Sequence, residues 1–261
     1  MFKINNFLDN DDVNILDKKG AFTVFEYKRD LSVTKDRAMY EYFASQMNVK
    51  LKQVMCDLSV SPITIQKGSM QWMVGNVNTT TGIKGVGDFF GKSIRGAVTK
   101  EAAIKPEYEG DGVIVLEPTY KHIILIDLAT WNNSLVLEDG YFLACDSNLK
   151  QKLVARNTLS SATLGNEGFF NLGIEGSGVV ALESPVPKEE LIEIELDNDQ
   201  VKIDGNFAIA WSKSLKFTVE KSSKSLIGSA ASGEGLVNVY RGSGKILMAP
   251  IKSDLTIGEE V

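Results

Sequence analysis

Apolar and polar residues alternate along several stretches of the second half of the chain. The alternation runs through Leu191–Leu196, Val201–Asp204 and Leu215–Glu220. A period of two is typical of a strand with one face buried and the other in solvent. The run His122–Leu128 is apolar at most of its positions, so we expect that strand to be covered on both faces. Short strands with hardly any helix predict an all-β fold, built as a β-sandwich or a double-stranded β-helix.

A glycine pair recurs at a fixed interval, each time ahead of an apolar run. Gly110, Gly176 and Gly242 are the first members, and each follows the one before by 66 residues. The second members, two positions later, are Gly112, Gly178 and Gly244. A glycine pair before a β-rich run is typical of a tight turn whose backbone needs a positive φ. Three such turns in register indicate a repeated structural unit.

A second set of glycines follows the same repeat. Gly68, Gly140 and Gly205 each follow a predicted strand and precede an apolar run with an aromatic residue, at spacings of 72 and 65 residues. We therefore predict a single all-β domain over residues 49–250, composed of three related units. The expected units span about residues 49–108, 109–174 and 175–250, with a tail over residues 251–261.

Residues 1–48 stand outside this repeat. Phe22–Tyr27 is predicted to be a strand, and a short helix is expected over residues 35–47 with Ser32 or Thr34 as its cap. The apolar side chains Met39, Phe43 and Met47 share one face of that helix. We expect this extension to pack on the body or to form a subunit contact.

A glycine-rich insertion over residues 79–100 interrupts the first unit. Its candidate interaction residues are Phe89, Phe90, Lys92, Ile94 and Arg95. Three hypotheses follow: the aromatic residues pack on the body or a neighbouring subunit, residues 83–100 lie on a membrane surface, or residues 85–93 bind a phosphate. The phosphate loop motif needs a glycine five residues before Gly91, where Val86 stands, and it needs a βαβ unit. We therefore favour the packing hypothesis.

Several motifs resemble one protein family. They are Gly68–Met73, the Leu-Ala-Cys-Asp of residues 143–146, the Gly-Glu-Gly-Leu of residues 233–236 and the Tyr-Arg-Gly-Ser-Gly of residues 240–244. Over roughly residues 48–250 the chain resembles the altered-inheritance-of-mitochondria family, whose bacterial members are mostly uncharacterised. The resemblance implies repeated β units like those of the tryptophan RNA-binding attenuation protein. The eukaryotic relatives are associated with mitochondrial organisation, which implies a scaffold role. No catalytic residue set is established in the family, so the resemblance implies no catalytic residues here.

Composition narrows the function classes. The chain has 261 residues and a net charge of −6, which argues against a general nucleic-acid surface. Cys56 and Cys145 are the only cysteines, too few for a disulfide framework, and we expect both to be core thiols. The N-terminus lacks the apolar stretch of a signal peptide, and no window approaches a membrane span. We therefore expect a cytoplasmic protein.

Candidate chemistry is sparse in this sequence. His122 is the only histidine, so we predict neither a histidine metal cluster nor a Ser/His/Asp triad. The acidic stretches Asp9–Asp12 and Asp197–Asp199 lack the spacing of a calcium loop, and Glu193 and Glu195 suit an exposed strand face. We predict no catalytic residues, no metal and no cofactor.

These observations favour a non-enzymatic scaffold or interaction protein that forms a homo-oligomer, with a further protein partner left open. Two alternatives stay open: a small-molecule-binding or enzymatic β-sandwich protein, and membrane-surface association through residues 83–100.

Overall fold

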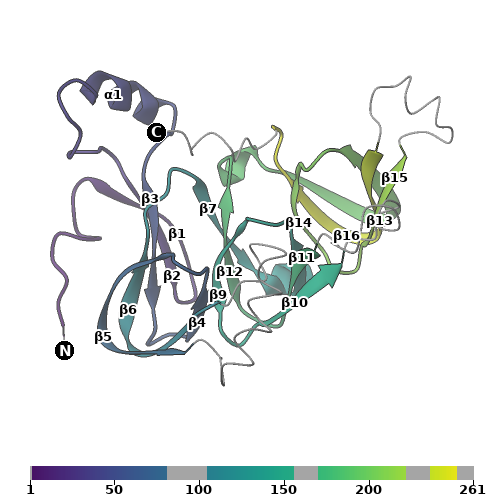
Figure 1. The fold of residues 1–261 in the computed structure, drawn as a ribbon, viewed down its shortest axis with the longest axis horizontal. Helices are drawn as coiled ribbons and strands as arrows, with labels where there is room; N and C mark the ends of the chain where they lie inside the picture. Colours follow the sequence, from purple (N-terminus) through teal and green to yellow (C-terminus); the bar gives the residue numbers. More distant parts are fainter. Residues whose placement is uncertain (1, 81–104, 156–169, 222–235, 252–261) are drawn as a thin grey trace.

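Strands make up most of the chain, as the alternating pattern predicts. The computed structural model describes residues 2–80, 105–155, 170–221 and 236–251. These residues contain the helix α1 (Ala38–Gln46), the short 3-10 helices η2 (Leu128–Trp131) and η3 (Lys188–Glu190), and strands β1 to β16. The all-β class with a short N-terminal helix and strand is confirmed (Figure 1).

Nine strands form the first sheet. Their bounds are β1 Val13–Lys19, β2 Phe22–Tyr27, β3 Lys52–Asp57, β4 Ile63–Ile65, β5 Met70–Thr80, β6 Glu107–Leu116, β7 His122–Asp127, β9 Phe142–Asp146 and β12 Val179–Ser184. The order is β1-β2-β3-β6-β4-β9-β12-β7, with β5 paired on β6. The two ends of this order, β1 and β7, approach each other, so the sheet curls into a barrel-like shape.

Seven strands form the second sheet, which stays open as a half-barrel. Their bounds are β8 Ser134–Leu137, β10 Lys150–Ala155, β11 Phe170–Glu175, β13 Ile192–Asp204, β14 Ala208–Trp211, β15 Lys216–Lys221 and β16 Leu236–Met248. The order is β10-β11-β8-β14-β16-β13, with β15 paired on β16. Strand β16 is the hub, because it pairs with β13, β14 and β15.

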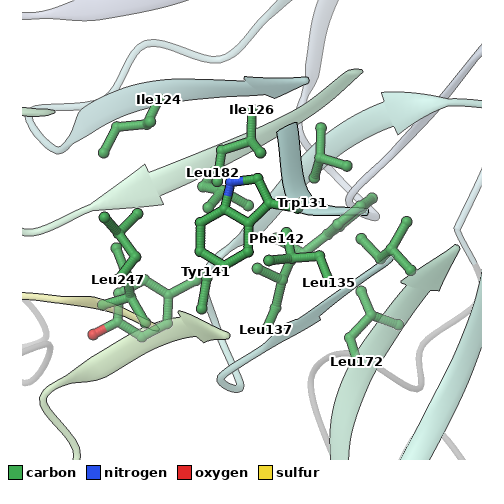
Figure 2. Packing of buried hydrophobic residues seen from close by; sticks show 14 of the residues in the cluster. Ile124, Ile126, Trp131, Leu135, Leu137, Tyr141, Phe142, Leu172, Leu182 and Leu247 are labelled. Carbon is green, nitrogen blue, oxygen red and sulfur yellow. The ribbon is translucent and has the colours of Figure 1, made fainter. Parts of the chain in front are cut away.

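Strand β7 is buried on both faces and joins the two sheets through a shared core. Ile123 and Leu125 point into the barrel-like sheet, whereas Ile124 and Ile126 belong to a cluster that includes side chains of β8, β11, β14 and β16. Figure 2 shows Trp131 among side chains from both sheets. This alternation confirms the expectation that the apolar run of β7 is covered on both sides.

The two sets of glycines occupy different structural positions. Gly68, Gly140 and Gly205 lie in turns between successive strands and have positive φ angles. The pairs at Gly110 and Gly242 begin inside strands β6 and β16, and only the pair at Gly176 connects two strands, β11 and β12. Two of the three expected tight turns are therefore bends within strands. The division of the chain into three repeated units stays a prediction.

The N-terminal extension differs in part from its prediction. Strand β2 is confirmed, and β1 is an additional strand that pairs with it. Helix α1 begins after Arg37, which makes no side-chain cap bond, so the expected cap at Ser32 or Thr34 is wrong. No residue of α1 is buried, and the helix stands off the first sheet at the upper left of Figure 1.

Candidate functional site

Helix α1 and its C-terminal cap present several large apolar side chains to solvent. These side chains are between 61% and 78% exposed. They are Met39, Tyr40, Tyr42, Phe43 and Met47. Tyr42 and Phe43 meet edge to face with 5.5 Å between ring centroids. We call this set of five residues the α1 surface. Large apolar side chains gathered in this way mark interaction sites more often than isolated exposed ones do.

Local hydrogen bonds hold α1 in place without burying it. Asp30 accepts bonds from the backbone N–H and the hydroxyl of Ser32, at 2.9 and 2.6 Å, which forms a turn before the helix. Arg37 and Glu41 form an ion pair at 2.8 Å across one helical turn. Asn48 has a φ of 64° and follows the last turn, where a left-handed residue ends a helix. The chain therefore builds a helix whose apolar side chains face solvent.

A narrow cleft separates α1 from the first sheet. Its volume is about 180 Å³, and its walls include Leu31, Tyr42, Val49, Leu51 and Tyr120. Burial raises the pKa of Tyr120, and the carboxylates of Glu41 and Asp30 raise it further. The Tyr120 hydroxyl is therefore protonated at neutral pH and available as a donor. A cleft of this size lies below the usual range of ligand pockets, so the α1 surface above it is the larger binding feature.

The candidate residues of the glycine-rich insertion cannot be compared with this surface. Phe89, Phe90, Lys92, Ile94 and Arg95 lie outside the described residues. The same holds for the membrane-surface and phosphate-loop hypotheses, which rest on residues 83–100.

The chemistry-bearing residues are dispersed over the fold. Cys56 and Cys145 are buried, which confirms them as core thiols, and burial raises the pKa of both. His122 opens β7, where burial and the Lys52 charge lower its pKa to about 4. No group of three His, Cys, Asp or Glu side chains converges within the described ranges. Nor does that part of the chain contain a helix long and apolar enough to cross a membrane.

Sequence reasoning identified only part of the α1 surface. Met39, Phe43 and Met47 share one face at helical spacing, and that face was expected to pack on the body or a subunit. Tyr40 and Tyr42 extend the apolar residues around the helix. The sequence alone shows that Tyr40 and Tyr42 fall outside the face of Met39, Phe43 and Met47. The apolar surface of this helix is therefore wider than the face that would pack against the body.

Known proteins are similar to most of this chain. The family described as "Mitochondrial biogenesis AIM24" matches residues 44–251. An uncharacterized protein of Streptococcus pyogenes serotype M6 is 28% identical over 203 residues, which cover 75% of this chain and 79% of that protein. The X-ray crystal structure of a Streptococcus pyogenes protein is similar with a TM-score of 0.57 at 27% identity, covering 79% of this chain and 90% of that one. With most of its length matched, the chain belongs to the AIM24 family.

Proposed function

We propose that the protein is a non-enzymatic interaction module that forms a homo-oligomer through the α1 surface. The observation that carries this proposal is the exposure of five large apolar side chains, four on one short helix and one, Met47, at its C-cap. Such a helix gains little from the fold itself, because none of its residues is buried. The hydrophobic effect favours covering these side chains, and a second copy of the chain supplies a matching surface.

The area of the α1 surface suits a dimer. A fully covered aromatic side chain buries about 150–250 Å². Met39, Phe43 and Met47, which share one face, therefore supply part of the roughly 800 Å² that each partner contributes to a standard interface. Leu31, which is 71% exposed, lies just before the helix and extends the same surface.

The charges of α1 are compatible with a two-fold contact. Arg37 and Glu41 place both signs one turn apart on the helix. In a two-fold interface each residue meets the symmetry-related surface, so Arg37 of one copy can face Glu41 of the other. Like charges alone would repel across such an interface. The apolar α1 surface and the charges of Arg37 and Glu41 beside it are therefore both compatible with a two-fold contact.

The buried thiols and the neutral imidazole support a role without catalysis. A raised pKa keeps Cys56 and Cys145 protonated at neutral pH, and the protonated thiol is a poor nucleophile. We extend the proposal to a scaffold acting in the cytoplasm without a cofactor. Repeated units like those of the tryptophan RNA-binding attenuation protein are part of the same proposal.

Light scattering on the full chain tests the self-association. We expect a mass of twice 28.6 kDa at concentrations of about 100 μM, with dissociation on dilution. The double variant Met39→Glu, Phe43→Glu should be monomeric at the same concentration, because it introduces four like charges into the two-fold interface.

The control variant is Val60→Glu. Val60 is 59% exposed in the turn between β3 and β4, so it tests whether any added surface charge prevents association. The proposal is supported if the Val60→Glu control forms a dimer and the double variant does not. A wild type that stays monomeric at about 300 μM, or a double variant that dimerises equally well, would refute it. Flotation of the wild type with anionic liposomes that is lost in the double variant would assign the α1 surface to a membrane instead.

A further inference from the structure

The barrel-like sheet is not closed by hydrogen bonds where its two ends meet. Strand β1 pairs with β2 and strand β7 pairs with β12, and no backbone pairing joins β1 to β7 in the described parts of the chain. A pocket of about 390 Å³ opens at this junction, lined by β1, β2, β3, β7 and η3. We call it the seam pocket. Its volume is within the range of small-molecule sites.

Lys52 supplies a buried positive charge to the seam pocket. The residue is 1% exposed, and its ammonium donates to the backbone carbonyls of Lys50 at 3.1 Å and Asn48 at 3.4 Å. An ammonium has three N–H donors, so two carbonyls leave one donor for a further acceptor. Burial lowers the pKa of Lys52, and the Glu26 carboxylate opposes that shift.

Glu26 supplies a buried negative charge to the same pocket. Its side chain is 8% exposed. Its Oε1 atom accepts from Asn14 Nδ2 at 3.3 Å and from Lys50 Nζ at 3.4 Å. Its Oε2 atom accepts no hydrogen bond from any described residue. A carboxylate has room for about four hydrogen bonds, so Glu26 retains capacity toward the pocket.

Lys52 and Glu26 do not form an ion pair with each other. Their charges interact electrostatically, yet no salt bridge within 4.0 Å joins them among the described residues. Burying a charge is costly unless it is compensated. Lys50 compensates Glu26 in part, through a salt bridge of 3.4 Å to Oε1. The Glu26 Oε2 atom and the Lys52 ammonium line one pocket without touching, which leaves space between them for a ligand that carries the matching charges.

The rest of the lining balances in charge. Lys19 pairs with Asp17 at 2.8 Å, and Lys188 stands beside Glu189 in η3. His122 is neutral near pH 7, and its ring nitrogens make no hydrogen bond to the described residues. The positive and negative side chains of the pocket are therefore equal in number. This balance favours a ligand without net charge over an anion or a cation.

We propose that the seam pocket binds a small zwitterion of the free amino acid class. The ligand carboxylate accepts from Lys52 Nζ, and its ammonium donates to Glu26 Oε2. His122 lies in the same lining and offers a donor and an acceptor to a polar group of the ligand. Glu26 precedes the family match at residues 44–251, whereas Lys52 and His122 lie within it. The N-terminal extension therefore completes the site.

Isothermal titration calorimetry of the full chain against the twenty common amino acids tests this proposal. We expect at least one to bind, and its N-acetyl and amide derivatives, which each lack one charge, to bind at least about tenfold more weakly. The isosteric variant Glu26→Gln should lose affinity for the zwitterion by a similar factor. The variant Lys213→Met, which removes a lysine from the exposed ion pair with Glu175, should bind normally.

Circular dichroism melting of each variant shows whether it folds. The variant Lys52→Met should also lose affinity for the zwitterion. If it does not fold, the affinity of the Glu26→Gln variant and the affinities of the two ligand derivatives still test the proposal. The proposal is overturned if no amino acid binds at about 10 mM, if the single-charge derivatives bind equally well, or if folded Glu26→Gln keeps full affinity. None of these outcomes depends on self-association through α1.

Discussion

Protonation of His122 makes the free energy of unfolding depend on pH. Burial, followed by the charge of Lys52, lowers its pKa to about 4 from an ordinary value of 6.5, against the opposing charges of Glu189 and Glu26. Between pH 6.5 and pH 4 the unfolded chain binds a proton at this position and the folded chain does not. The contribution of His122 to stability is therefore fully present above pH 6.5 and declines as the pH falls toward 4.

The variant His122→Gln should reduce this pH dependence. Urea unfolding at pH 7.5 and at pH 5 measures the loss of unfolding free energy on acidification, and we expect the wild type to lose more than the variant. Carboxylates with lowered pKa values, such as Glu220 at about 2, weaken the fold at lower pH in both proteins, so the difference isolates His122. If the wild type and the variant lose the same unfolding free energy between pH 7.5 and pH 5, His122 is not the source of this pH dependence.

The burial of the two thiols could be predicted from the sequence, whereas the residues of the seam pocket could not. The burial of Cys56 and Cys145 followed from the apolar runs around them, because a thiol in such a run is a core side chain. The meeting of Glu26, Lys52 and His122 has no local motif. Only the closure of the sheet brings β2, β3 and β7 to one pocket, and that closure depends on strand order.

At the scale of elements, the β5–β6 hairpin depends on a glycine inside a strand. Gly110 has a φ of +125°, and a Cβ there would lie 2.2 Å from the carbonyl oxygen of Asn76 on β5. Gly68 has a φ of +82° with open space around its Cβ position. We expect Gly110→Ala to cost about 3 kcal/mol or more, because strain and a backbone clash combine. Gly68→Ala should cost only about 1–2 kcal/mol.

Urea unfolding of both alanine variants at pH 7.5 measures this difference. Each variant replaces a glycine of positive φ, so the comparison separates the clash from the backbone conformation. If Gly110→Ala lowers the free energy of unfolding no more than Gly68→Ala does, then β5 and β6 can move apart at little cost.

The long antiparallel pair of β13 and β16 explains why turn signals were only partly informative. The alternating pattern places residues 191–196 and 201–204 in two separate runs, with the acidic stretch Asp197–Asp199 between them. The structure has one strand, β13, with a bulge between Leu196 and Asp199, opposite Gly244 and Gly242 of β16. Two local turn signals therefore face each other across a pair of bent strands, and pairing over more than forty residues is invisible to a local pattern.

At the scale of the whole molecule, the shared core predicts that both sheets unfold together. Leu137 of β8 is fully buried in the cluster that also contains Ile124 of β7 and Leu182 of β12. We expect Leu137→Ala to cost about 2–5 kcal/mol and to shift one calorimetric transition without dividing it.

Leu236→Ala serves as the control for this prediction. Leu236 is 48% exposed at the start of β16, so the substitution should change stability by only about 0.5 kcal/mol. Two separate transitions, with only one shifted by Leu137→Ala, would show that the sheets unfold independently.

The hub position of β16 has a consequence for synthesis on the ribosome. Strands β13, β14 and β15 precede β16 in the chain, and each of them pairs with it. Since translation proceeds from the N-terminus, these three strands emerge before the partner that joins them. The edges that will pair with β16 are exposed to wrong pairing during that interval. Strands β13 and β15 pair only with β16, so they can join the second sheet only after residues 236–248 have left the exit tunnel, whereas β10, β11, β8 and β14 can pair earlier.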